Sequence, residues 1–260
     1  MSAAPYASLN LGNHVGDAPE AVAENRRRLK AAAGLPAEPA WLTQVHGTTV
    51  VDLDAAPDLD TAVAGPVGPV DLDTARTGRV GPTDLGTART GAAGPADLGA
   101  SGLADAAFTR RRGRVCAILT ADCLPIVLAA DSGDLVAAAH AGWRGLAGGV
   151  IEATVKALQV APERLMAWLG PAIGPEHFEV GAEVRQAFVK GDLGAAAFVP
   201  NARGRFMADL SALARRRLEA LGVGRIYGGG QCTYADGDRY FSHRRDGVTG
   251  RQATLIWLEP

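Results

Sequence analysis

The feature that most constrains the fold is a set of three apolar segments in the middle of the chain, residues 115–121, 124–130 and 135–140. Each has the length of a strand and few polar side chains, and the Asp-Ser-Gly-Asp segment 131–134 separates the second from the third as a turn. Continuous apolar runs of this length are typical of strands that are buried on both faces. The chain must therefore cover a sheet on both sides, which favours an α/β or α+β fold.

The flanking sequence supplies helices and strands that can cover such a sheet. A first helix is predicted from Asp17, its expected cap, to about residue 33, and Gly34 follows its end. Apolar residues at helical spacing predict further helices near 146–158, 180–190 and 210–221, the last capped by Asp209. Additional strands are expected at 41–51, 165–169, 225–227, 239–242 and 254–258. Because strands occur singly, in hairpins and around helices, we expect one catalytic domain over residues 1–260, with a large mixed sheet flanked by helices.

Residues 54–103 interrupt this pattern with a Gly- and Pro-rich repeat. The segment 68–78 (GPVDLDTARTG) recurs at 81–91 (GPTDLGTARTG) and begins again at residue 94. Each copy carries one or two sizeable apolar side chains, which cannot offset an ordering cost of ~1–2 kcal/mol per residue. A short solenoid or a partner-binding arm is the alternative. We expect a disordered loop inserted into the domain.

Composition excludes several classes of function. With a net charge of -2, the chain has no general basic surface for nucleic acid. Three cysteines do not make a disulfide framework and suit a reducing compartment. The first residues lack the pattern of a signal peptide, and no apolar run is long enough for a membrane span. A cytoplasmic protein is expected, as a monomer or weak homodimer.

Two histidines and one cysteine stand where the chain leaves predicted strands. His46 lies in a strand pattern that a glycine interrupts, His140 ends the third apolar segment, and Cys123 stands between the first two. Neutral imidazoles and a thiolate are ligands that zinc prefers, and catalytic zinc sites keep three protein ligands and one open position. The three residues are therefore candidate ligands of one Zn²⁺ ion, which would activate water at neutral pH.

The same residues allow a different chemistry. Cys123 and His140 also fit a thiolate nucleophile and its base, with Asp122 as the group that orients the histidine. Cys116 belongs to a strand pattern and is expected in the core, whereas Cys232 follows three glycines and is as compatible with a structural role as with a functional one. Arg245 fits either an anion-binding role or a local ion pair with an adjacent aspartate.

Several short motifs together resemble the YfiH / laccase-domain family. The resemblance covers the chain outside the repeat insertion, in matching order. It rests on QVHG (44–47), ADCLP (121–125), HAGWRG (140–145), GPAIGP (170–175), FSHRRD (241–246) and TGR (249–251), with LNLG at 9–12. The resemblance also places an extra strand ahead of Pro5, which this chain reaches directly after Met1–Ala4.

The resemblance implies a fold, a metal site and an activity. It implies a single mixed α/β domain in which His46, Cys123 and His140 bind zinc, with copper as the less favoured metal. It implies a purine nucleoside phosphorylase for adenosine, inosine, guanosine and methylthioadenosine that also deaminates adenosine. Purine nucleosides and inorganic phosphate are then the expected small-molecule partners. Asn10, Arg144 and Arg245 are the candidates for binding them.

Three other functions remain open at this stage. One is a cysteine-type hydrolase or peptidoglycan-editing factor that acts through Cys123. Another is a copper-dependent polyphenol oxidase (laccase), which five histidines in all make less favourable. The third is a non-catalytic metal-binding protein, which the repeats and the short N-terminus would favour.

Overall fold

The computed structural model describes residues 1–55, 103–189 and 194–260. The predicted repeat loop at 54–103 falls almost entirely outside these residues. The described chain forms a mixed α/β fold with one large sheet of six strands and two sheets of three strands. None of the helices in these segments has the length and apolar character needed to cross a bilayer.

The three apolar segments form strands, as predicted, but only the second and third are neighbours in one sheet, and the first lies in another sheet. They are β4 (Val115–Thr120), β5 (Leu124–Ala130) and β6 (Val136–Ala141). The large sheet has the order β11-β7-β5-β6-β3-β2, with β2 (Val50–Asp52), β3 (Ala106–Thr109), β7 (Leu165–Leu169) and β11 (Arg225–Gly228). It is mixed, since β11 runs parallel to β7 and β2 runs parallel to β3, whereas β5 is antiparallel to both of its neighbours.

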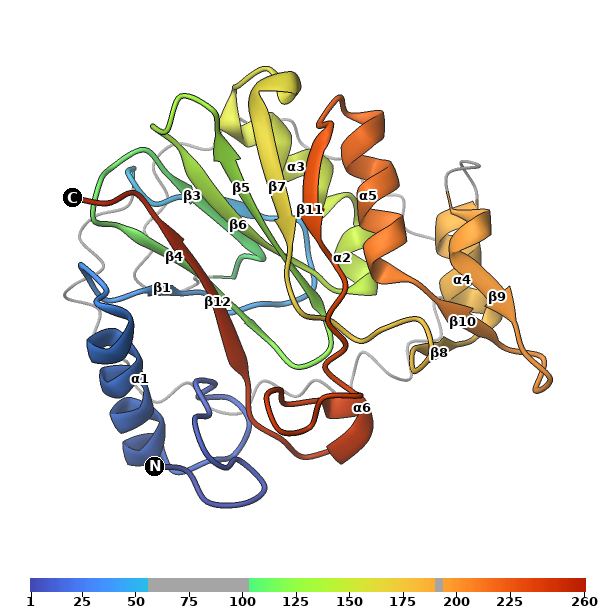
Figure 1. Ribbon diagram of the computed structural model, residues 1–260, viewed down its shortest axis with the longest axis horizontal. Coiled ribbons are helices and arrows are strands. Elements are labelled where there is room, and N and C mark those ends of the chain that lie inside the picture. Colours follow the sequence, from blue (N-terminus) through green and yellow to red (C-terminus); the bar gives the residue numbers. More distant parts are fainter. Residues whose placement is uncertain (56–102, 190–193) are drawn as a thin grey trace, which may run out of the picture.

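The central strands of the large sheet are buried on both faces because they place alternate side chains in two cores, whereas Trp168 of β7 and Tyr227 of β11 are exposed. Ala137 and Ala139 of β6 belong to the core shared with the helices, and Ala138 between them belongs to the second core. The helical layer consists of α2 (Trp143–Gly148), α3 (Val150–Leu158) and α5 (Leu210–Ala220). Figure 1 shows α2 and α5 on one side of the sheet, with β4 and β12 on the other.

The second core lies between the large sheet and a three-stranded sheet of order β1-β4-β12. This sheet contains β1 (Ala40–Trp41) and β12 (Gln252–Trp257), which is antiparallel to β4. The helix α1 (Pro19–Ala33) lies beside it, and Arg26 of α1 stacks on Trp41. The remaining elements are β8 (Glu179–Val180), β9 (Phe198–Pro200) and β10 (Phe206–Ala208) in the third sheet, with α4 (Ala182–Val189) and α6 (His243–Asp246).

Several predicted elements differ from the structure. The strand expected at 41–51 is two short strands, β1 and β2, separated by a loop. The helix expected at 146–158 is broken at Gly149, whose left-handed backbone (φ 98°) ends α2 and begins α3. Residues 239–242 form no strand and lead into α6. Ala18, rather than Asp17, is the N-cap of α1, because the Asp17 carboxylate accepts hydrogen bonds from Ser2 and Asn10.

Candidate metal centre

The structure brings His46, Cys123 and His140 together although 94 positions separate the first from the last. Their ligand atoms all lie within 4.8 Å of one another. The Cys123 sulfur is 3.7 Å from His46 Nε2, and the two imidazole rings meet edge to face at a centroid distance of 4.7 Å. Within the described residues, this is the one group of three such side chains with this spacing.

Each of the three residues comes from a strand end or a tight loop. His140 lies near the end of β6 and is buried. Cys123 follows Asp122 in the connection between β4 and β5, where Asp122 has a left-handed backbone (φ 92°). His46 lies in the loop between β1 and β2 and also has a positive φ of 61°. Non-glycine residues adopt such a backbone only where surrounding contacts hold it.

Asp105 is the group that holds the His46 loop. Its carboxylate is fully buried and accepts backbone N–H bonds from Val45, His46 and Gly47, at distances between 2.6 and 3.2 Å. Burial raises the pKa of Asp105, but the bonds from His140 and from this loop lower it more, so that the pKa lies below its ordinary value. The ionised carboxylate therefore fixes the backbone that presents His46.

The same carboxylate orients His140. Asp105 Oδ1 is 2.8 Å from His140 Nδ1, and the backbone N–H of His140 donates to the Asp105 carbonyl at 2.7 Å. A proton on Nδ1 leaves Nε2 unprotonated and available to a metal, which is the usual carboxylate–histidine arrangement at metal sites. The alternative in which Asp122 orients the histidine is contradicted, since Asp122 accepts instead from the Thr233 hydroxyl and the Arg244 backbone.

Charge in the group favours a thiolate. Burial raises the pKa of the Cys123 thiol, but the charge of His140 and the hydrogen bonds from both imidazoles lower it to about 6. The pKa of His140 rises to about 9, because Cys123 and Asp105 outweigh the effect of its burial. At neutral pH the metal-free group therefore pairs the Cys123 thiolate with a protonated His140. A metal ion that takes the place of the Nε2 proton would meet the sulfur and nitrogen donors that zinc and copper prefer.

Two glycines of the HAGWRG motif make room for this group. A Cβ at Gly142 would lie 2.8 Å from the Cys123 sulfur and 3.0 Å from His46 Cδ2. A Cβ at Gly145 would lie 3.0 Å from the Gly47 carbonyl oxygen. The motif thus supplies a ligand and also the space in which the other two ligands approach it.

The donor set fits one metal ion. Metal–ligand bonds of ~2.0–2.3 Å in a tetrahedron place neighbouring ligand atoms about 3.3–3.8 Å apart. The Cys123 sulfur and His46 Nε2, 3.7 Å apart, lie in that range, and no two of the three ligand atoms are more than 4.8 Å apart. Because only three side chains converge within the described residues, a fourth position is available to water or substrate.

The predicted substrate-binding residues lie in different settings. Asn10 is fully buried, and its amide bonds to Gly12, to Asp17 and to the backbone N–H of Arg251. Arg144 is exposed, with its guanidinium 4.5 Å from the centroid of the Trp143 ring. Substrate binding by these residues stays a prediction.

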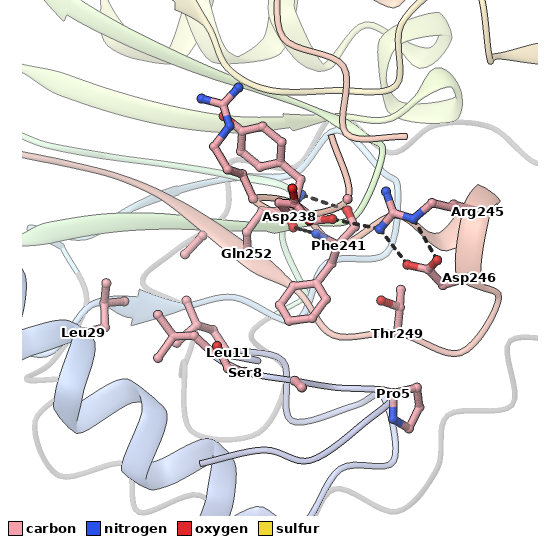
Figure 2. Close-up of a pocket in the computed structure, with 16 residues that line it drawn as sticks. Pro5, Ser8, Leu11, Leu29, Asp238, Phe241, Arg245, Asp246, Thr249 and Gln252 are labelled. Atoms are coloured by element: carbon pink, nitrogen blue, oxygen red, sulfur yellow. Dashed lines mark hydrogen bonds and ion pairs between the residues drawn. The ribbon is translucent and has the colours of Figure 1, made fainter. Parts of the chain in front are cut away.

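Arg245, the third candidate, is bonded to its own surroundings. It donates to the backbone carbonyls of Thr233, Tyr234 and Tyr240 and pairs with Asp246. Figure 2 shows Arg245 and Asp246 at a cavity of about 320 Å³ between the N-terminal segment and residues 237–253. None of the three clustered ligands lines that cavity, so it is separate from the metal centre.

Fold and site together define a mixed α/β protein with a candidate mononuclear metal centre at the ends of its strands. A family model described as multi-copper polyphenol oxidoreductase laccase matches residues 1–259, and the chain belongs to that family. The resemblance to the YfiH / laccase-domain family is thereby confirmed.

Similar proteins cover nearly the whole chain. It is 44% identical over 258 residues to the purine nucleoside phosphorylase YfiH of Escherichia coli, an alignment that covers 99% of this chain and 89% of that protein. It is 47% identical over 261 residues to the purine nucleoside phosphorylase PA4543 of Pseudomonas aeruginosa (100% and 89%).

Solved structures support the fold. The Neisseria meningitidis protein NMB0706 matches with a TM-score of 0.79 at 42% identity, covering 100% of this chain and 90% of that one. YlmD from Geobacillus stearothermophilus matches with a TM-score of 0.78 at 30% identity (100% and 88%). The predicted fold class, one large mixed sheet flanked by helices, is confirmed.

Proposed function

We propose that this protein is a zinc-dependent purine nucleoside phosphorylase that also deaminates adenosine. The observation that carries the proposal is the convergence of His46, Cys123 and His140 around the buried Asp105 carboxylate. Full-length relatives that bear the name purine nucleoside phosphorylase support the substrate class. The three cysteines are unpaired, which suits a reducing compartment such as the cytoplasm.

In this proposal His46, Cys123 and His140 hold the zinc ion. Bound zinc supplies a Lewis acid, which polarises substrate oxygens and acidifies water at neutral pH. Asp105 keeps the proton of His140 on Nδ1, so that Nε2 stays a ligand atom. Zinc is the metal proposed because catalytic zinc sites combine three nitrogen, sulfur or oxygen ligands from the protein with one open position.

The two reactions differ in the nucleophile. In phosphorolysis, a phosphate oxygen bonds to the anomeric carbon of the ribose while the bond from that carbon to the purine nitrogen breaks. The purine leaves with the bonding electron pair and takes up a proton. In deamination, the oxygen of water bonds to the purine carbon that carries the amino group, and that group leaves as ammonia with protons from water. We propose adenosine, inosine, guanosine and methylthioadenosine as substrates.

The experiment incubates zinc-loaded protein with inosine or adenosine, with and without phosphate, and separates the products by chromatography. We expect hypoxanthine and ribose-1-phosphate from inosine, and both adenine and inosine from adenosine. Cys123→Ala should be inactive, and Cys232→Ala, which removes a different thiol, should retain activity. Purine release by wild type no greater than by Cys123→Ala would overturn the phosphorylase proposal. Failure to form inosine from adenosine would remove the deaminase part alone.

One observation favours a second candidate, a cysteine-type hydrolase. The lowered pKa of Cys123, with His140 beside it and Asp105 behind His140, matches the order of groups in a nucleophile–base–acid set. This candidate predicts turnover that survives removal of metal by a chelator and covalent capture of Cys123 by a thiol-reactive substrate analogue. Activity lost on chelation and restored by Zn²⁺ would exclude it.

A further inference from the structure

Phosphorolysis requires a cation that holds inorganic phosphate beside the reacting carbon. The arginines of the short motifs differ in how many protein groups their guanidinium groups contact. The Arg245 guanidinium is bonded to several protein groups, as described above. Arg244 donates from Nη1 to the Glu179 carbonyl. Arg144 is exposed and stacked on Trp143. Arg251, of the TGR motif, differs from these arginines because only its Nη1 atom has hydrogen-bond partners among the described residues.

The sheet register places Arg251 beside the centre. The last pair between β12 and β4 is Gln252 with Thr120, so Arg251 follows opposite Ala121, two residues before Cys123. Its backbone is tied to the N-terminal segment, because its N–H donates to Asn10 Oδ1 at 2.9 Å and its carbonyl accepts from the Leu11 N–H at 3.0 Å. The residue is therefore held from both sides.

The segments that flank the Arg251 side chain pack closely at two glycines, Gly12 and Gly250. A Cβ at Gly12 would lie 2.8 Å from Arg251 Cγ, so the aliphatic stem packs directly over that glycine. A Cβ at Gly250 would lie 2.7 Å from the Phe241 ring and 2.9 Å from Asn10 Cβ, so the preceding residue has no room for a side chain. These contacts fix the direction in which the half-buried side chain leaves the backbone.

The guanidinium keeps hydrogen-bonding capacity. Its Nη1 donates to the carbonyls of Thr249 and Gly250 at 3.0 Å, and neither Nε nor Nη2 has a partner among the residues that the structure describes. Within that same part of the chain, no carboxylate forms an ion pair with it. Nε and the adjacent Nη2 form the edge of a guanidinium that binds two oxygens of a phosphate or carboxylate.

Charges of both signs lie near Arg251. Burial lowers the pKa of Arg251, and the charges of Cys123 and Asp122 act in the opposite direction, which indicates that both lie within electrostatic range. The Asp122 carboxylate already accepts bonds from Thr233 and the Arg244 backbone, so it is occupied without pairing with Arg251. Burial lowers the pKa of His14 to about 4, and the positive charges of Arg251, Arg26 and His140 act in the same direction.

We propose that Arg251 binds the inorganic phosphate of the phosphorolysis reaction beside the metal centre, through the Nε and Nη2 edge of its guanidinium. The inference rests on the proposed phosphorylase function and assigns the phosphate position within that site. It also gives Gly12 a role, because this glycine allows the Arg251 stem to lie flat against the N-terminal segment.

The test uses zinc-loaded wild type, Arg251→Met, Arg251→Lys and Gly12→Ala, with Arg164→Met as a matched control. Arg164 is exposed and pairs with Asp131, away from the centre. We expect the KM for phosphate to rise at least about tenfold in Arg251→Met, as for loss of a charge-assisted hydrogen bond. Arg251→Lys should fall between it and wild type, since lysine keeps the charge without the two-pronged edge. The KM for inosine and the zinc content should stay near wild type in both.

Gly12→Ala keeps the guanidinium but displaces its stem, so it should raise the phosphate KM with unchanged zinc content. Calorimetric titration of each protein with inorganic phosphate, without nucleoside, measures binding apart from turnover. If wild type binds phosphate but does not convert inosine, the proposed phosphorylase function is rejected. The calorimetric titrations of the variants then still test whether Arg251 binds phosphate. The inference is overturned if the phosphate KM or the binding heat is unchanged in Arg251→Lys, and this outcome can be read even if Arg251→Met does not fold. It is also overturned if the wild-type protein binds no phosphate.

Discussion

Among the residues that the structure describes, a cysteine sulfur lies next to an imidazole at two places, and the surroundings of these two places differ. At the metal centre, Cys123 meets both His46 and His140, and Asp105 orients one ring and holds the loop of the other. At the second place, the Cys232 sulfur lies 3.6 Å from His177 Nδ1.

The Cys232 sulfur acts as a hydrogen-bond acceptor for backbone N–H groups of its loop. It accepts backbone N–H bonds from Gly174 at 3.2 Å and Ala235 at 3.4 Å, and the His177 ring stacks on Tyr234. Only two potential ligands meet there among the described residues, and no carboxylate orients the ring. The comparison of the Cys123 and Cys232 sites indicates that a Cys–His contact is a candidate metal site only when a third ligand and a buried orienting group are also present.

The sharpest test of this comparison is removal of each sulfur. Cys123→Ser should reduce bound zinc from about one equivalent per chain to near zero and abolish turnover, because a neutral hydroxyl is a poor zinc ligand. Cys232→Ser should keep its zinc and most of its activity. Elemental analysis of both variants provides the measurement, and equal zinc loss in the two would break the distinction.

Asp105→Asn tests the orienting carboxylate. The amide cannot accept all the bonds that the carboxylate now accepts from His140 and the His46 loop. Zinc affinity should fall about 10–100-fold, the usual cost of losing such a partner. Competition with a fluorescent chelator measures the affinity. His177→Asn, the counterpart at the second pair, should leave it unchanged.

A pair of glycine substitutions probes the space around each sulfur. Gly142→Ala would place a Cβ 2.8 Å from the Cys123 sulfur, and Gly174→Ala would place one 3.2 Å from the Cys232 sulfur. Overpacking costs ~1–3 kcal/mol. We expect the first variant to lose zinc affinity by about tenfold. The second should lose about 1 kcal/mol of unfolding free energy with zinc retained. Zinc loss confined to Gly174→Ala would contradict the assignment.

The smallest effect is a pH dependence of thiol reactivity in metal-free protein. With a pKa of about 6, Cys123 is mostly thiolate at pH 7 and gains a proton as the pH falls, so its alkylation rate should drop about twofold between pH 7 and pH 6. Burial raises the pKa of Cys116, which should stay unlabelled. Mass spectrometry after iodoacetamide treatment measures the alkylation of each cysteine. Added Zn²⁺ should slow the alkylation of Cys123 alone. A Cys123 rate that is independent of pH over this range would refute the lowered pKa.

The strands and candidate ligands that could be predicted depend on the sequence of a single short segment each. The segments at 115–121, 124–130 and 135–140 carry an apolar pattern that fits strands buried on two faces, and they form β4, β5 and β6. The Asp209 cap was likewise predictable, and its side chain accepts from the Ala212 N–H. The region 41–51 was harder. Its β-rich composition favours a strand, but the loop conformation at His46 depends on Asp105, 59 positions away.

The sequence by itself therefore determined the buried strands, most helices, and the types of residue that can bind a metal, because these follow from short-range periodicity and donor chemistry. Only the tertiary structure decided that two histidines and a cysteine converge and that Asp105, not Asp122, orients His140. It also decided that the Nε and Nη2 edge of Arg251 has no partner among the described residues. The physical reason is that such a site depends on hydrogen bonds between distant segments. One buried carboxylate stabilises the loop conformation of His46 and orients the ring of His140 in β6, and neither segment would fix that geometry alone.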